Sequence, residues 1–347
     1  MNIQFFSKYI DDYKNKIGKI VKVGKSSRGI DYDHERSYLM PKDKQLKAKW
    51  NAINKFFGLD DSDNTFGLFK QAATGLERQR ITQLNSSSLF AFLFFHTVSR
   101  DNKVKVKIND HEDEFTNVAF EVSNTIDENT LPEEYGTKHR PVSHIDVVLS
   151  NERTILFLEC KFSEYLEHYS SSDIDVSQRA YHTFYDKVFN VDVGGGVEDL
   201  EFIEVKNHKN IKSITIRKKD GGPCYSAGLA QTIAHFMGAH GILNSGRSHK
   251  DKDIRIEDKE LYLAEVVFDF SYLASLSNDE KKKVDAALKS YAKFHKRLCE
   301  KLNTIKVAHE KERMITVHTD LLCYQRDFKL KLPSAFIDFY NLPETFR

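Results

Sequence analysis

The chain has 347 residues, with 52 Lys and Arg against 51 Asp and Glu, which gives a formal net charge of +1 at pH 7. This length supports one large domain or two modest ones, and it excludes small scaffolds that depend on disulfide or metal staples. Charged residues make up 30% and hydrophobic residues 40%, with only 6 prolines, so we expect a packed, soluble protein. Because the charges nearly cancel, a polyanion would have to meet a local basic surface.

The cysteines and apolar runs indicate the compartment. The four cysteines form no C-x-x-C pair, a pattern typical of reduced intracellular thiols. The first 16 residues contain several charges and do not resemble a signal peptide. The longest apolar run, Leu89–Phe95, is far shorter than the roughly 20 residues that cross a bilayer. We therefore expect a cytoplasmic protein without a membrane span.

Residues 1–85 are predicted to form a helical, lysine-rich region. Its clearest helix ends at Gly58 and has apolar residues at helical spacing, Leu46, Trp50, Ile53 and Phe57. The segment from Lys14 to Arg28 contains basic residues and no acidic one. Such a segment can line a phosphate backbone, but its composition is more often that of a solvated stretch.

From residue 86 onward the pattern changes to alternating helices and strands. A serine-rich N-cap precedes a helix over 89–98 that is apolar on nearly every side and should pack flat on a sheet. A strand over 118–122 places Glu121 on the face opposite its apolar side chains. Two apolar runs, 145–149 and 154–162, are separated by four polar residues, which is a hairpin signature.

The second half of the chain supplies the remaining elements. They are a strand over 200–205, a helix over 226–237, a strand over 261–270, a helix starting at Ser277 with a capping box, and a strand over 314–322. The order of helix, three strands, helix and strand predicts an α/β fold with a mixed sheet flanked by helices.

The hairpin contains charged residues within strands that are otherwise built for burial. Glu159 and Lys161 share one strand face because strand side chains alternate. A two-residue turn at Glu152-Arg153 places Asp146 directly across from Glu159. Facing Cβ atoms lie about 5 Å apart, so the two carboxylates need a counter-charge, and Mg²⁺ with waters and a phosphate suits them. Lys161 can then orient a water or stabilise phosphate charge.

An acid two residues before a lysine is common by chance. The chain repeats the pattern several times, for example at Glu204-Val205-Lys206. What distinguishes Glu159 and Lys161 is their place in an apolar strand, together with Asp146 at the mirrored hairpin position. The sequence contains no H-E-x-x-H zinc motif, no G-x-S-x-G elbow and no correctly spaced P-loop, so zinc hydrolysis, serine catalysis and P-loop phosphate binding are unsupported.

The hairpin and the order of elements over residues 86–325 resemble the PD-(D/E)XK nuclease superfamily. The resemblance implies a restriction endonuclease-like core, αβββαβ, within a nuclease-like domain at 86–347. It also implies that Asp146 and Glu159 bind the metal and that Lys161 assists the attacking water. This sequence has Ile145 where the family name has proline, a substitution that the superfamily often shows.

Three further residues belong to the hypothesis. The superfamily often adds another acid, and Glu121 is the candidate, although an ordinary solvent-facing glutamate is an equal interpretation. Gln231 is predicted to position the substrate or the water, because the helix after the motif strand often lends a polar residue to the site. His235, one turn later, is interpreted as a structural histidine with satisfied ring nitrogens.

These observations predict a Mg²⁺-dependent phosphodiesterase, with Mn²⁺ able to substitute, most simply a DNA endonuclease of restriction or defence type. Lysines near the N-terminus or in the segment Lys206–Lys219 would contact phosphates. Cutting both strands commonly requires two active sites, which is compatible with a homodimer. Three alternatives stay open: a catalytically inactive nuclease fold that binds nucleic acid, an RNA-directed nuclease, because aromatic side chains can stack on unpaired bases, and a metabolic enzyme.

Overall fold

A computed structural model of the chain describes fifteen ranges or single positions. They are 42–60, 62–73, 86–108, 110–125, 142–162, 173–175, 196–197, 200–208, 211–218, 229–245, 256, 258–273, 276–304, 315–318 and 320–347. The basic segment Lys14–Arg28 lies outside these residues, and so do the side chains of Lys206–Lys219. Among the described residues, no helix has the length and apolarity needed to cross a membrane.

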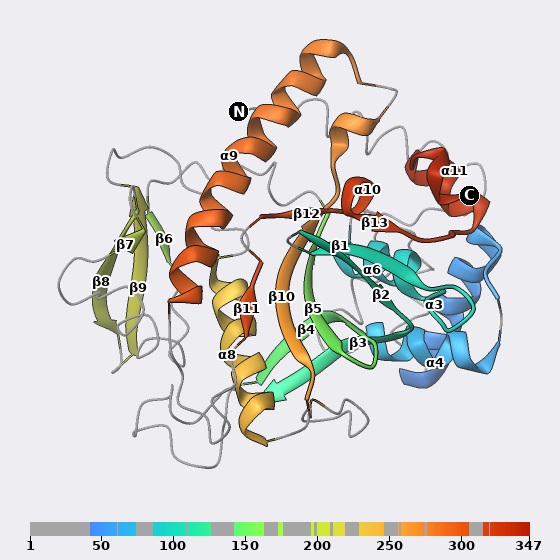
Figure 1. The fold of residues 1–347 in the computed structure, drawn as a ribbon, viewed down its shortest axis with the longest axis horizontal. Helices are drawn as coiled ribbons and strands as arrows, with labels where there is room; N and C mark the ends of the chain where they lie inside the picture. Colours follow the sequence, from blue (N-terminus) through green and yellow to red (C-terminus); the bar gives the residue numbers. More distant parts are fainter. Residues whose placement is uncertain are drawn as a thin grey trace.

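A mixed sheet forms the centre of the molecule (Figure 1). Its strands lie in the order β11-β10-β5-β4-β3, with β12 also beside β10. The strands are β3 (Asn117–Thr125), β4 (Val142–Ser150), β5 (Thr154–Lys161), β10 (Glu260–Val267), β11 (Thr316–Val317) and β12 (Leu322–Cys323). Strands β3, β4 and β5 pair antiparallel, whereas β10 pairs parallel with β5. The prediction of an α/β fold around a mixed sheet is confirmed.

Helices cover both faces of this sheet. Helix α6 (Ser87–Phe95) contacts β4 and β5, and helix α8 (Leu229–Ser245) contacts β3, β4, β5 and β10. Phe90 of α6 packs on Phe162, while His235 of α8 meets Glu159. Successive side chains of a strand point to opposite faces of the sheet, and Phe162 and Glu159 are three positions apart. The two helices therefore lie on opposite faces. All eight residues of β5 are therefore buried.

The hairpin register matches the sequence prediction. Val147 faces Leu158 and Ser150 faces Ile155, so Asp146 and Glu159 are the next facing positions. The amide of Asn151 donates to the carbonyl of Thr154 over 3.0 Å, which closes the two-residue turn. The Asn151 side chain reinforces this turn by accepting the amide of Thr154 over 2.6 Å.

Helices from the two ends of the described chain pack on α6. They are α3 (Lys42–Phe57), α4 (Asp63–Ala72) and α11 (Ser334–Tyr340). Trp50 of α3 is fully buried and meets Phe92 of α6 edge-on, with ring centroids 6.1 Å apart. Helix α3 ends at the predicted Gly58, whose φ of 60° favours glycine. The domain boundary at residue 85 stays a prediction.

Two smaller sheets flank the central one. One is β13-β1-β2, formed by β1 (Val104–Ile108), β2 (His111–Phe115) and β13 (Phe328–Lys329). The other is β6-β9-β8-β7, formed by β6 (Asp173–Asp175), β7 (Gly196–Val197), β8 (Leu200–His208) and β9 (Ile211–Lys218). The sequence pattern predicted only β8 among these, because β1 and β2 alternate with charged residues that pair with each other on the exposed face.

Several element boundaries differ from the prediction. Helix α6 ends at Phe95, because His96 takes the C-cap position and its Nδ1 turns back to the carbonyls of Phe92 and Leu93. The expected strand over 314–322 is replaced by two short strands, β11 and β12, and between them the amide of Asp320 donates to Nδ1 of His318. Helix α9 (Asn278–Asn303) follows the predicted capping box, and short helix α10 (Tyr324–Asp327) comes after β12.

Candidate active site

Four acidic residues lie in a row across the central sheet, one on each of the neighbouring strands β3, β4, β5 and β10. Glu159 of β5 is the register partner of Glu265 of β10. Asp146 is the position of β4 that faces Glu159, one step beyond the last pair of the β4–β5 ladder. On the other side of β4, the pairing steps from Phe120 and Val147 to Val122 and Ile145, which leaves Glu121 opposite Asp146. The sheet therefore gathers the predicted acids at one level.

Asp146 sits where the β4–β5 ladder opens. Its Oδ2 accepts the backbone amide of Cys160 over 2.7 Å, so the side chain takes the position of a ladder hydrogen bond. Burial raises the pKa of this carboxyl well above its usual value, and the nearby charges of Glu159 and Glu121 raise it further. Asp146 is thus an acid whose ionised form lacks sufficient counter-charge.

Glu121 has a backbone conformation that is unusual for a residue with a side chain. Its φ is +48°, in the left-handed region that costs a non-glycine residue about 1–3 kcal/mol and occurs often at functional sites. The residue is partly buried, and its charge acts on Asp146. The sequence pattern placed Glu121 away from the apolar face of its strand, and the structure brings it to the acidic row.

Glu159 is the most extensively bonded acid of the row. Its Oε1 accepts from Lys161 Nζ, and its Oε2 lies 2.5 Å from Nε2 of His235. Both Glu159 and Lys161 are almost fully buried. Burial alone would raise the pKa of Glu159, but the charges of Lys161 and His235 outweigh it and hold the pKa below the usual value.

Helix α8 completes the network around Lys161. Gln231 Oε1 accepts a hydrogen bond from Lys161 Nζ, so the predicted positioning residue touches the predicted lysine. His235 lies one helical turn further, and its Nδ1 is 2.6 Å from the hydroxyl of Ser143. Both ring nitrogens of His235 are therefore engaged, as expected of a satisfied histidine. Ser143 is itself buried and precedes Asp146 on β4, so this chain of contacts ties α8 to the hairpin.

Glu265 is the member of the row that sequence reasoning missed. It is 1% exposed and accepts hydrogen bonds from Tyr291 of α9 and, over 3.2 Å, from Thr232 of α8. Burial is the main cause that raises its pKa to about 7, with Glu159 adding to the effect. The available signal was an acid in the apolar run that forms β10, the criterion that had identified Asp146 and Glu159.

The ammonium group of Lys161 is the shared counter-charge of three carboxyl groups. The Lys161 charge lowers the pKa of Asp146, Glu159 and Glu265 alike. If all of these acids and Glu121 were ionised, they would carry more negative charge than Lys161 can balance, and the raised pKa values of Asp146 and Glu265 reflect this. The donors are hard carboxylate oxygens, the ligand type that Mg²⁺ and Mn²⁺ prefer. Asp146 and Glu159 supply such oxygens, whereas the described residues contain no group of three or more side chains that could hold a metal ion.

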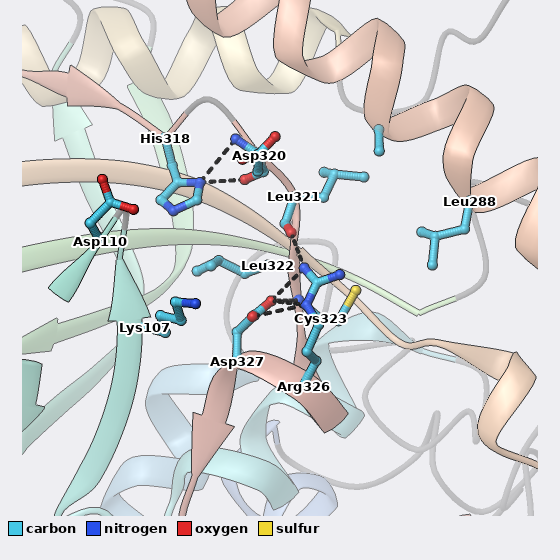
Figure 2. A pocket seen from close by; sticks show the side chains of 11 residues that line it. Lys107, Asp110, Leu288, His318, Asp320, Leu321, Leu322, Cys323, Arg326 and Asp327 are labelled. Atoms are coloured by element: carbon cyan, nitrogen blue, oxygen red, sulfur yellow. Dashed lines mark hydrogen bonds and ion pairs between the residues drawn. The ribbon is translucent and has the colours of Figure 1, made fainter. Parts of the chain in front are cut away.

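A cleft of about 390 Å³ lies apart from this cluster (Figure 2). Leu288 of α9, Lys107 of β1 and Cys323 of β12 are among its lining residues, and no member of the acidic row lines it. Among its charged lining residues, Arg326 pairs with Asp327 at 2.7 Å. The cleft and the acidic row are therefore separate features of the molecule.

Comparison with known proteins gives no assignment. No family model, no curated protein and no solved structure matches the chain. The geometry of the acidic row and of Lys161 is therefore the basis for a functional proposal.

Proposed function

We propose that the chain is a metal-dependent phosphodiesterase with a restriction endonuclease-like core, most simply a DNA endonuclease. The order β3-β4-β5-β10, with β10 parallel to β5 and helices α6 and α8 on opposite faces, supports the αβββαβ core. The observation that carries the proposal is the facing pair Asp146 and Glu159 with Lys161 bonded beside it inside a buried hairpin.

Each residue has a chemical role in this proposal. Asp146 and Glu159 would hold a Mg²⁺ ion, which supplies Lewis-acid stabilisation of the phosphate and lowers the pKa of a bound water. Lys161, oriented by Gln231, directs a positive charge at the attacking water or at the negative charge that builds on the phosphate. His235 of α8 holds the Glu159 carboxylate in place, and Ser143 of β4 holds the other ring nitrogen of His235.

A cleavage assay tests this function. Purified protein is incubated with supercoiled plasmid and Mg²⁺ or Mn²⁺, alongside Asp146→Asn, Glu159→Gln and the matched control Glu114→Gln. Glu114 also faces a lysine across two strands, Lys105 at 2.8 Å, but on the exposed face of β1 and β2.

We expect both cluster variants to lose at least about 100-fold in cleavage rate, with the control at wild-type rate. Equal rates in the wild type and Asp146→Asn would contradict the proposal, as would a wild type that cleaves neither DNA nor RNA. Cleavage of single-stranded RNA but not of DNA would support a phosphodiesterase and would show that its substrate is RNA.

One observation favours a second candidate, a nuclease fold that only binds nucleic acid. Both oxygens of Glu159 already have partners in Lys161 and His235, so the carboxylate is satisfied without a metal. In this case the protein would bind DNA in the presence of a chelator, Asp146→Asn would bind equally well, and no preparation would cleave.

A further inference from the structure

The outer face of helix α9 carries a row of lysines, which we call the lysine stripe. Its members are all exposed: Lys282, Lys289, Lys293 and Lys296. Their separations of seven, four and three residues place them on one side of a helix with roughly 3.6 residues per turn. The opposite side of α9 is buried and includes Tyr291, Leu298 and Leu302. The stripe therefore faces away from the core along most of the helix.

The stripe is flanked by acids on its own side of α9, with Asp285 four residues before Lys289 and Glu300 four residues after Lys296, and its middle is a run of basic charge. Within the part of the chain that the structure describes, Lys289, Lys293 and Lys296 have no ion pair, whereas Lys282 pairs with Asp279 at 3.6 Å. The sequence between Ala286 and Cys299 contains no acidic residue. In a protein whose net charge is only +1, this stretch is a local concentration of like charge that an anionic partner would stabilise.

We propose that the lysine stripe binds the phosphate backbone of duplex nucleic acid. From Lys282 to Lys296 the helix rises about 21 Å at about 1.5 Å per residue. A duplex presents a phosphate about every 3.4 Å on each strand, so this length follows about six base pairs. The inference deepens the proposed nuclease function and rests on it for the choice of nucleic acid as the polyanion.

Helix α9 lies between the stripe and the acidic row, because the side of α9 that reaches Glu265 is the buried side opposite the lysines. Helix α9 packs against α8, which carries Gln231 and His235, and its Tyr291 donates to Glu265. Figure 1 shows α9 in orange beside α8 and the central sheet. A duplex on the stripe would lie on the outer side of the helix that walls the acidic row.

The composition of α9 argues against a membrane as the partner. An interfacial helix inserts an apolar face into the lipid, but the apolar face of α9 is buried against the rest of the protein. Between Lys289 and Lys296, the exposed residues are Ser290 and the stripe member Lys293. Because the apolar face of α9 is buried, its exposed lysines suit a polyanion backbone better than a lipid surface.

The test is a binding titration in which no cleavage occurs. A labelled duplex of 25 base pairs in EDTA is titrated with the full chain at several salt concentrations. The stripe variant combines Lys289→Gln, Lys293→Gln and Lys296→Gln. The matched control combines Lys103→Gln, Lys105→Gln and Lys329→Gln, which removes the same charge from lysines that are paired with Glu112 and Glu114. A third variant replaces the stripe lysines by arginine, and anionic phospholipid vesicles serve as the competing ligand.

We expect the glutamine stripe variant to bind the duplex at least tenfold more weakly at about 0.1 M salt and to lower the slope of log K against log salt by about 2–3. The control and the arginine variant should bind like the wild type. Wild-type affinity in the stripe variant, an equal loss in the control, or a loss on vesicles alone would overturn the inference. If the stripe variant loses duplex binding and the wild type never cleaves, the lysine stripe is supported and the nuclease function is contradicted. If the stripe variant binds the duplex normally and the wild type cleaves, the nuclease function is supported and the lysine stripe is contradicted.

Discussion

The acidic row and the exposed face of the β13-β1-β2 sheet use the same residue types in opposite ways. On the small sheet, Glu114 pairs with both Lys103 and Lys105, and Glu112 pairs with Lys329, with side chains between 40% and 72% exposed. In the central sheet, Lys161 is buried together with Glu159 and Glu265. The surface charges are paired and screened by water, whereas the buried charges are shielded from bulk water.

This difference separates a region of paired surface charges from one in which burial shifts the pKa of carboxyl groups. A surface ion-pair ladder aids solubility and register at little energetic consequence. In the acidic row, burial raises the pKa of Asp146 well above its usual value and that of Glu265 to about 7. Changing one charge in each region tests this contrast.

Removal of the buried lysine should have the largest effect on stability. Lys161→Met leaves the buried carboxyls of Asp146 and Glu159 without their shared counter-charge, so we expect a loss of about 3–5 kcal/mol in the free energy of unfolding. Lys105→Met, which removes an exposed partner of Glu114, should change it by less than about 1 kcal/mol. Urea denaturation at pH 7 measures both. Equal losses would remove the distinction between the two regions.

The next effect is the pH dependence that Glu265 contributes. Its pKa is raised to about 7 in the folded protein and returns to its ordinary value near 4.3 on unfolding. Between these values the folded state holds a proton that the unfolded state has lost, so stability falls as the pH rises. At about 1.4 kcal/mol per pKa unit, the contribution is about 3 kcal/mol between pH 4.5 and 7.5.

Glu265→Gln cannot ionise and keeps a group that can accept from Tyr291. We expect its stability to fall by less than that of the wild type between pH 4.5 and 7.5. Chemical denaturation at several pH values gives the difference curve. Parallel curves for the two proteins would show that Glu265 ionises normally in the folded state.

A smaller and opposite effect is expected for Asp146. Asp146→Asn removes a charge that burial, Glu159 and Glu121 all disfavour, and its carbonyl can still accept the amide of Cys160. The metal-free variant should therefore be more stable than the wild type by about 1–2 kcal/mol, while Glu114→Gln on the surface should gain nothing. A destabilised Asp146→Asn would mean that the ionised carboxylate contributes to folding.

The sequence was informative wherever local pattern decides structure. A two-residue turn fixes which residues of a hairpin face each other, which is why the facing of Asp146 and Glu159 was predictable. Helix α9 followed from a capping box and apolar spacing. Glu265 was predictable by the same criterion of an acid in an apolar strand, but the prediction required the parallel pairing of β10 with β5.

Other features depended on contacts between distant segments. The bond between Ser143 and His235 joins residues that are 92 positions apart, and no spacing in the sequence indicates it. Strands β1 and β2 were missed because HEDEF is too acidic to resemble a strand, and its pairing with VKVKI is supported by lysine–glutamate contacts across the ladder. Apolar periodicity identifies the buried face of α9, but exposed lysines on the opposite face are common to most surface helices and do not by themselves indicate a binding site.

The proposed function depends on Asp146 and Glu159 forming a divalent-cation site. The most direct measurement is the electron paramagnetic resonance of Mn²⁺ titrated into the wild type, Asp146→Asn and Glu114→Gln in the presence of a nucleic-acid duplex. We predict one bound Mn²⁺ per chain in the wild type and in Glu114→Gln, and its loss in Asp146→Asn. Mn²⁺ binding that is unchanged in Asp146→Asn, or absent from the wild type, would contradict the claim.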